Sequence, residues 1–123
     1  MKILLVDDDK FFQKFYSLKL KEQGIEMDIA SDGEEGFAKA GQFMPDLILL
    51  DLIMPKADGF SFLQKRLLDE NIKKIPVIVF STLGQERDID NAKKLGAADY
   101  VDKSFFDFGT LMAKINNVLH PSG

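Results

Sequence analysis

The chain has 123 residues, of which 46% are hydrophobic, so it is long and apolar enough for one domain with its own core. Its 16 Lys and Arg against 20 Asp and Glu give a net charge of -4, which disfavours nonspecific binding to nucleic acid or an anionic membrane. Cysteine is absent, which excludes disulfides and thiolate chemistry, and the single histidine, His120, excludes a His-rich metal site. There is no signal-peptide pattern and no apolar run near the ~20 residues of a membrane helix, so we expect a soluble cytoplasmic protein.

Aliphatic runs alternate with helical patterns along the chain. Unbroken runs such as Ile3–Val6 and Leu47–Leu50 are typical of strands buried on both faces of a parallel sheet. The predicted strands are 3–6, 25–30, 47–50, 77–80 and 99–101, and the predicted helices are 9–23, 31–41, one beginning at 58–59, 84–95 and one around 111–119. Asp9 is the expected N-cap of the first helix, and Ser31 with Glu34 has the spacing of a capping box that opens the second.

The order of these elements predicts the fold class. Five strands that alternate with five helices over short connections predict an α/β domain with a parallel sheet, helices on both faces and right-handed crossovers. No linker, repeat or low-complexity segment divides the chain. We therefore expect one domain over residues 1–120, followed by a short tail at 121–123.

Polar side chains follow four of the predicted strands. In a parallel sheet the carboxyl ends of all strands lie at one edge, where ligands bind. The residues expected at this edge are Asp7, Asp8, Asp51, Ser81, Thr82 and Lys103. Asp51 alone would be explained as a turn or helix cap, but the presence of Asp7, Asp8 and Lys103 at the same edge favours a functional site.

This set of groups suits phosphoryl transfer. Crowded carboxylates repel one another unless a cation lies between them, and Mg²⁺ takes carboxylate and phosphate oxygens as ligands. Asp51 could act as a nucleophile that forms an aspartyl-phosphate, while Lys103 neutralises charge and Ser81 donates a hydrogen bond. The reaction needs mainly positioning and charge compensation, which these residues would supply.

The same residues resemble the receiver domain of two-component response regulators over essentially the whole chain. The matching motifs are Val6-Asp7-Asp8, Asp51 followed by Met54-Pro55 and Asp58-Gly59, Ser81 after an aliphatic strand, Gly96-Ala97 before Asp99-Tyr100-Val101, and Lys103. Each motif is weak by itself, but their joint order and spacing are highly specific. The resemblance implies the flavodoxin-like, CheY-like fold with strand order 2-1-3-4-5.

The resemblance also implies a role for each site residue. Asp51 would be the phosphoacceptor, and Mg²⁺, or alternatively Mn²⁺, would be held by Asp7, Asp8, Asp51 and the backbone carbonyl of Ile53. Lys103 would pair with the phosphoryl group. Ser81 and Tyr100 would be the switch residues, Ser81 moving toward the phosphoryl group and Tyr100 changing between outward and inward rotamers.

The partners follow from the resemblance in the same way. The phosphodonor would be a phosphohistidine on a sensor histidine kinase or a histidine phosphotransfer protein, docked in part on the first helix, where Phe11 is expected to be exposed. The output surface would be the fourth helix, fifth strand and fifth helix, read by a downstream protein or domain. We expect a monomer, or a weak dimer on phosphorylation, with no direct contact with nucleic acid or membrane.

Two other classes of protein fit less well. An Asp-nucleophile phosphatase would generally need a second acid close after Asp51 and a substrate-enclosing cap, but Ile53 stands two residues on and no cap insertion exists. A flavin-binding electron carrier of this fold would need a phosphate-binding loop after the first strand, where Asp7, Asp8 and Asp9 would repel the phosphate.

Four positions depart from the family's pattern. Ser104 stands where the family usually has proline after the Lys, often with a cis peptide bond, and a cis bond before a residue other than proline costs ~3 kcal/mol or more. Thr82 stands where a small Ala is common. Ile53 and Leu83 are apolar at positions that influence an attacking water, so we expect slow self-dephosphorylation.

Overall fold

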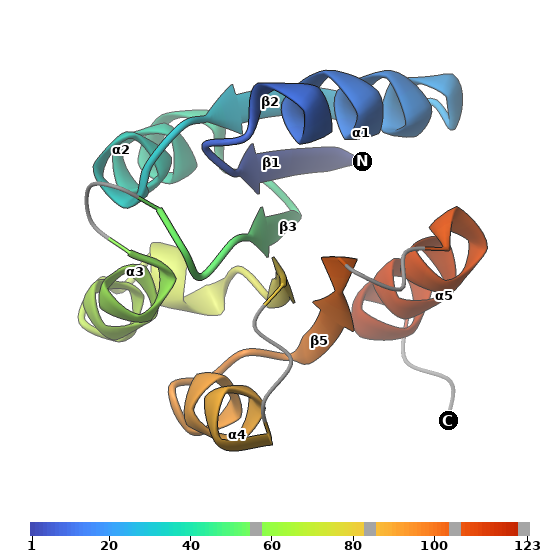
Figure 1. The fold of residues 1–123 in the computed structure, drawn as a ribbon. Helices are drawn as coiled ribbons and strands as arrows, with labels where there is room; N and C mark the ends of the chain where they lie inside the picture. The colour runs from blue at the N-terminus through green and yellow to red at the C-terminus, as the bar shows by residue number, and fades with distance from the viewer. Residues whose placement is uncertain (55–57, 83–85, 104–106, 121–123) are drawn as a thin grey trace.

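The computed structural model of the chain describes residues 1–54, 58–82, 86–103 and 107–120. Within them the elements are β1 (Lys2–Val6), α1 (Lys10–Glu22), β2 (Glu26–Ala30), α2 (Gly33–Phe43), β3 (Leu47–Leu50), α3 (Gly59–Leu67), the short 3₁₀ helix η1 (Ile72–Lys74), β4 (Val77–Ser81), α4 (Glu86–Lys94), β5 (Asp99–Asp102) and α5 (Phe108–Leu119) (Figure 1). The predicted strands and helices are all present, whereas η1 was not predicted. None of the described helices is long and apolar enough to span a bilayer.

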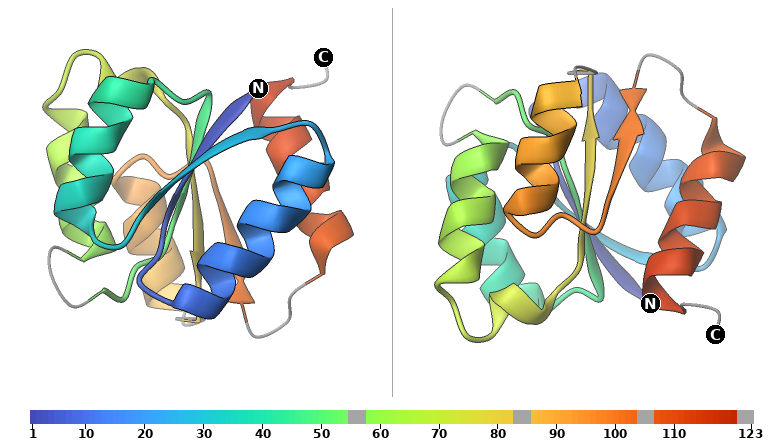
Figure 2. Two further views of the ribbon diagram at one scale, coloured as in Figure 1. Left: turned by 90° about the horizontal axis from the view of Figure 1, so that it is seen from above. Right: turned by 90° about the horizontal axis from the view of Figure 1, so that it is seen from below.

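The five strands form one parallel sheet in the order β2-β1-β3-β4-β5, which confirms the predicted fold class and strand order. Helices α1 and α5 cover one face of the sheet, and α2, α3 and α4 cover the other (Figure 2). The crossover at β1 reverses the direction in which strands are added, so the loops that follow β1 and β3 leave toward opposite faces. Such a switch point is the common ligand site of open α/β sheets.

Alternation along the central strands explains their unbroken aliphatic sequence. In β1, Ile3 and Leu5 pack in the cluster beneath α1 and α5, while Leu4 and Val6 pack in the cluster beneath α2, α3 and α4. All four side chains have no exposed surface. Successive side chains of a strand point to opposite faces, so a sheet covered on both sides requires apolar residues at every position.

The N-caps of α1 and α2 show where the sequence pattern was read correctly and where it was not. Asp9 caps α1 as predicted, and its Oδ1 accepts from the N–H groups of Phe11 and Phe12 at 2.9 and 3.2 Å. The prediction of Ser31 as the cap of α2 was wrong, because the cap is Asp32. The Ser31 hydroxyl instead accepts from Gln13 Nε2 at 3.1 Å, a partner that is remote in sequence.

The turn between β3 and α3 brings two backbone segments very close together. Gly59, the first residue of α3, donates its N–H to the carbonyl of Leu52 at 3.1 Å. A Cβ at Gly59 would lie 2.5 Å from the backbone oxygen of Asp51 and 2.7 Å from Cα of Leu52, where real Cβ atoms are not found. The position therefore requires glycine for lack of space, and any larger residue would displace Asp51.

Replacing Gly59 by alanine tests this close approach. We expect Gly59→Ala to lower the free energy of unfolding by about 1–3 kcal/mol, because the added methyl group is forced against backbone atoms. Urea denaturation measures the change. Gly41→Ala in α2 is the matched control, since nothing lies within 4 Å of its Cβ position, and it should raise stability by up to about 1 kcal/mol. Equal effects of the two variants would contradict the explanation.

Candidate functional site

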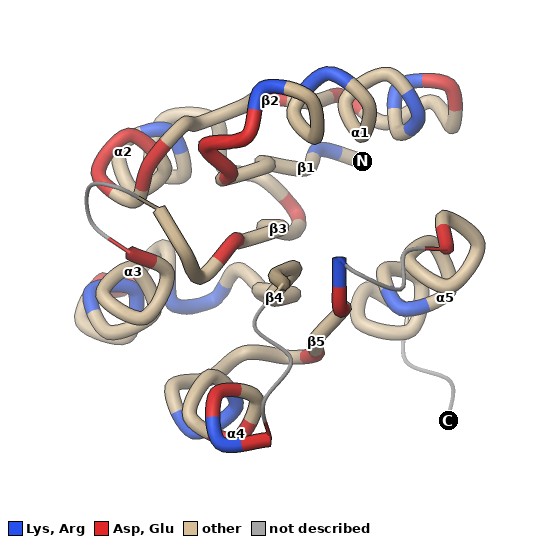
Figure 3. Tube along the Cα trace, in the orientation of Figure 1, with Lys and Arg blue, Asp and Glu red and all other residues tan. Residues whose placement is uncertain are grey.

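The sheet register brings the residues of the site to one level. Val6 lies beside Ala30 on one side and Leu50 on the other, so the residues that follow β1 and β3 leave the sheet side by side. The backbone ladder continues one residue further, because Asp7 donates its N–H to the carbonyl of Ala30 at 3.0 Å and Asp51 donates to that of Val6 at 2.9 Å. The two carboxylates are thus held by strand backbone rather than by a loose loop. Acidic segments follow β1 and β3, and a basic segment lies at the end of β5 (Figure 3).

Three carboxylates meet at this edge. Asp7, Asp8 and Asp51 each offer an oxygen, and these oxygens lie within 4.8 Å of one another. Asp7 is fully buried, Asp51 is 6% exposed and Asp8 is exposed. The structure therefore brings together the three acids that the sequence assigned to one site.

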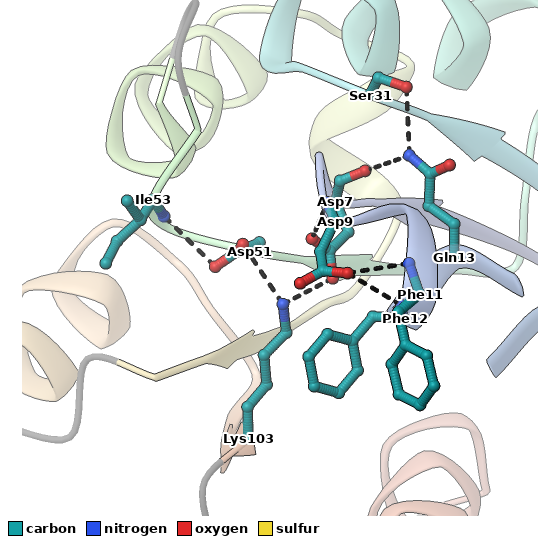
Figure 4. A network of polar contacts seen from close by, with 9 residues as sticks. All are labelled: Asp7, Asp9, Phe11, Phe12, Gln13, Ser31, Asp51, Ile53 and Lys103. Atoms are coloured by element: carbon teal, nitrogen blue, oxygen red, sulfur yellow. Dashed lines mark hydrogen bonds and ion pairs between the residues drawn. The ribbon is translucent and has the colours of Figure 1, made fainter. Parts of the chain in front are cut away.

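Lys103 supplies a positive charge to this cluster. Its Nζ lies 2.6 Å from Oδ2 of Asp7 and 3.4 Å from Oδ2 of Asp51, and its side chain is only 4% exposed (Figure 4). Of the two carboxylates, Asp7 is therefore the main partner of the ammonium in this state. One ammonium against three carboxylates leaves a formal charge of 1 - 3 = -2 at the edge of the sheet.

Burial is the main influence on the pKa of Asp7, and the neighbouring charges add to it or offset it. Burial raises the pKa of the Asp7 carboxyl above its usual range, the hydrogen bond from Lys103 lowers it only in part, and the charge of Asp51 raises it further. A cation beside the three carboxylates would favour the ionised form and oppose this rise. Hard divalent cations prefer oxygen donors, so the donor set fits an ion such as Mg²⁺.

Ile53 lies next to the carboxylate of Asp51. Its N–H donates to Oδ1 of Asp51 at 3.3 Å, and the residue is 52% exposed. The backbone of the exposed Ile53 therefore holds one oxygen of Asp51, and its apolar side chain stands two residues after Asp51 in sequence. The contacts do not involve the carbonyl of Ile53, so its role as a metal ligand stays a prediction.

The two expected switch residues are both buried. Ser81 is the last residue of β4 and has no exposed surface, and it pairs in register with Asp102 of β5. Tyr100 of β5 packs in the cluster beneath α4 and is 9% exposed, so its ring takes the inward orientation. Its hydroxyl has no hydrogen-bond partner among the described residues, and burial raises the pKa of Tyr100 to about 12. The rotamer change itself stays a prediction.

The remaining expectations concern the loops around the site. Thr82 is exposed at the end of β4. Leu83 and Ser104 lie outside the described residues, and with them the isomer of the Lys103–Ser104 peptide bond. Phe11 is 69% exposed, as expected.

Sequence reasoning missed the groups that support these charged residues. Gln13 is buried, and its Nε2 donates to the backbone carbonyl of Asp7 and to Ser31 Oγ, which ties α1 to the loops after β1 and β2. Phe12 and Phe80 fall in a predicted helix and a predicted strand, and their ring centroids lie 4.5 and 5.3 Å from Nζ of Lys103. The sequence signal for Gln13 was a polar residue on the predicted buried face of α1. No local sequence feature indicated that the rings of Phe12 and Phe80 would lie near Lys103.

Comparison with known proteins identifies relatives along nearly the whole chain. The family model of the response regulator receiver domain matches residues 3–116. The chain is 39% identical over 118 residues to the DNA-binding dual master transcriptional regulator RpaA of Synechocystis, which covers 96% of this chain and 48% of RpaA. It is 36% identical over 118 residues to Protein PilH of Pseudomonas aeruginosa, covering 96% of this chain and 97% of PilH. The chain thus spans about half the length of RpaA and nearly all of PilH.

Solved structures show the same likeness. Chemotaxis protein CheY4 of Vibrio cholerae superposes with a TM-score of 0.89 at 30% identity, covering 96% of this chain and 98% of that one. The CheX-CheY-BeF3-Mg²⁺ complex of Borrelia burgdorferi contains a chain with a TM-score of 0.89 at 29% identity, and 96% and 88% of the two chains are covered. Sequence, fold and the acidic site agree, and the chain belongs to the response regulator receiver domain family of two-component signalling.

Proposed function

We propose that this receiver domain is a phosphorylatable switch whose Asp51 accepts a phosphoryl group from a phosphohistidine on a partner protein. The observation that carries the proposal is the placement of Asp51. Its carboxylate lies at the end of β3, with Asp7 and Asp8 within 4.8 Å and the Lys103 ammonium at 3.4 Å. A carboxylate that has Lys103 beside it, and a bound cation to offset the other two carboxylates, is a suitable nucleophile for phosphorus, since the incoming group is itself negative.

In the proposed step a carboxylate oxygen of Asp51 forms a bond to phosphorus while the phosphorus–nitrogen bond of phosphohistidine breaks. The electron pair of that bond stays on the imidazole nitrogen. The Lys103 ammonium, which contacts Asp7 in this structure, would also contact a phosphoryl oxygen, and the Ser81 hydroxyl would donate a hydrogen bond to another phosphoryl oxygen. Asp51 would remain positioned by its N–H bond to the Val6 carbonyl, which the reaction does not disturb.

The same residues would hold the metal ion. Asp7, Asp8, Asp51 and the backbone carbonyl of Ile53 are the proposed ligands of Mg²⁺, or of Mn²⁺ in its place. Bound there, the ion supplies positive charge that neutralises the carboxylates and the phosphoryl oxygens. The buried Asp7, with its raised pKa, and the exposed Asp8 support this proposal, since one anchors the site and the other faces solvent.

The outer surface of α1 supports a helical protein as phosphodonor. Phe11 and Leu18 are 69% and 59% exposed, which is unusual for large apolar residues on a capped surface helix. With Lys14 and Phe15 they line a hollow of about 240 Å³. This surface begins at Phe11, two residues after the N-cap Asp9, at the end of α1 that follows Asp7 and Asp8, and we propose that a partner helix bound on it presents its histidine to Asp51.

The output of the switch would be the surface of α4, β5 and α5, to which the buried Tyr100 belongs. We propose a downstream protein or domain as its reader and no direct contact with nucleic acid. The DNA binding in the name of RpaA belongs to a protein about twice as long as this chain. We further propose a phosphoacceptor, not an enzyme acting on other molecules, and a monomer that dimerises weakly at most. A cytoplasmic location stays a prediction from the sequence.

Incubation with Mg²⁺ and acetyl phosphate tests the phosphoacceptor directly. We expect intact mass spectrometry to show one added phosphoryl group on the wild-type chain and none on Asp51→Asn. Asp90→Asn is the control, because Asp90 lies exposed on α4, remote in sequence from the strand-end acids, and should be phosphorylated like wild type. A phosphoryl group that persists on Asp51→Asn would refute the assignment.

Magnesium binding has a readout that does not need phosphorylation. We expect 10 mM Mg²⁺ to raise the melting temperature by a few degrees, since an ion that binds only the folded state with a Kd near 1 mM stabilises it by about 1.4 kcal/mol. Asp8→Asn, a substitution at an exposed carboxylate, should fold normally and lose most of this rise. Thermal melts with Mg²⁺ and with EDTA measure it. An identical rise in wild type and variant would remove Asp8 from the metal site.

Ile53 should slow the loss of the phosphoryl group. An exposed apolar side chain beside Asp51 cannot hydrogen-bond and orient an attacking water, so we expect the isolated phosphorylated domain to persist beyond minutes. Ile53→Asn should shorten the half-life several-fold, while Ile53→Leu should leave it unchanged. Quantitative mass spectrometry after removal of the donor gives the rates. Loss within minutes that is the same in wild type and Ile53→Asn would show that Ile53 plays no such part.

A further inference from the structure

Two aromatic rings surround the ammonium group of Lys103. Its Nζ lies 4.5 Å from the centroid of the Phe12 ring and 5.3 Å from that of Phe80, both inside the ~6 Å range of cation–π contacts. The same Nζ meets the carboxylates of Asp7 and Asp51, and the side chain is only 4% exposed. Figure 4 shows the Phe12 ring beside the Lys103 side chain, which extends to the two carboxylates.

We propose that Phe12 and Phe80 are positioning residues that hold the Lys103 ammonium at Asp7 and Asp51, and so set the rate of phosphoryl transfer to Asp51. The proposal rests on the proposed function for its effect on rate. The faces of aromatic rings carry negative charge density and attract a cation, most strongly where water is excluded. An aliphatic side chain could fill the same space but would not attract the ammonium.

The rings are themselves held in place by one another. Phe12 stacks on Tyr16 with centroids 5.4 Å apart, and Phe80 meets Phe12 and Tyr16 edge to face at 6.2 and 4.7 Å. This cluster joins α1 to β4 across the sheet face beneath α1 and α5. A ring held in such a cluster keeps a defined position, which a lone surface aromatic would not.

The capped start of α1 couples Phe12 to the acidic site. Asp9 accepts from the N–H of Phe12 at 3.2 Å, and the N–H of Asp9 donates to Oδ1 of Asp7 at 3.0 Å. The ring on one side of the ammonium and the carboxylate on the other therefore belong to one hydrogen-bonded turn. Lys103 is followed in sequence by Ser104 rather than proline, so its position does not rest on a proline ring.

The electrostatic effect of the Phe12 ring can be separated from its packing by changing the charge distribution of the ring while keeping its shape. Phenylalanine with one, two or three ring fluorines at position 12 keeps the shape and progressively weakens the attraction for a cation. We expect the rate of phosphorylation by acetyl phosphate with Mg²⁺ to fall stepwise, by about five- to tenfold at three fluorines. The same series at Phe62, fully buried in the opposite core cluster, should leave the rate unchanged. A flat series at position 12, or an equal fall at position 62, would overturn the proposal.

A measurement on Lys103 itself keeps the two proposals distinguishable. Ring faces shift nearby protons upfield, so the ε-methylene protons of Lys103 should resonate upfield of those of Lys114 and return toward them in Phe12→Leu. Unshifted protons in wild type would overturn the inference, whatever the rate of phosphorylation. Shifted protons in a wild-type chain that takes no phosphoryl group would refute the proposed function and, with it, the effect on rate.

Discussion

The ion pair of Lys103 with Asp7 is the interaction on which the site depends. Removing an ammonium and a carboxylate from water costs several kcal/mol per ion unless close contact and further hydrogen bonds compensate. Here the compensation is a 2.6 Å contact, an N–H bond from Asp9 to Asp7 and two ring faces around the ammonium. The pair joins residues 96 positions apart, so it forms only when the whole sheet is assembled.

The sheet serves as a rigid support for these charges. Its central strands are apolar on both faces and pack between two clusters, which leaves the strand ends as the place for polar groups. Asp7 and Asp51 extend the hydrogen-bonded ladder by one residue, and Gly59 lets α3 begin directly against the backbone of Asp51. A small movement at Asp51 would therefore displace the start of α3. Residues of α3 and Tyr100 pack in one core cluster beneath α2, α3 and α4. This arrangement supports the proposal that phosphorylation of Asp51 alters the surface of α4, β5 and α5.

Much of the fold could be predicted because the signals were local and mutually consistent. Aliphatic runs, helical spacing and turn residues agreed on every strand and α-helix, although not on η1, and the strand-end acids followed from the topology. The error at Ser31 has a physical cause. Ser31 and Asp32 are both residue types that cap helices well. Asp32 caps α2, and the Ser31 hydroxyl instead accepts a hydrogen bond from Gln13 of α1. A window of a few residues contains no information about such a partner.

The sequence by itself determined the α/β class and the meeting of Asp7, Asp8, Asp51 and Lys103 at one edge, because both follow from residue type and position along a strand. The strand order was implied only by the resemblance of its motifs to the receiver domain. Only the tertiary structure decided that Lys103 bonds Asp7 more closely than Asp51, that Tyr100 lies inward, and that Phe12 and Phe80 surround the ammonium. Those outcomes depend on distances between side chains of different elements. Such distances are set by packing across the sheet and leave no mark in local sequence.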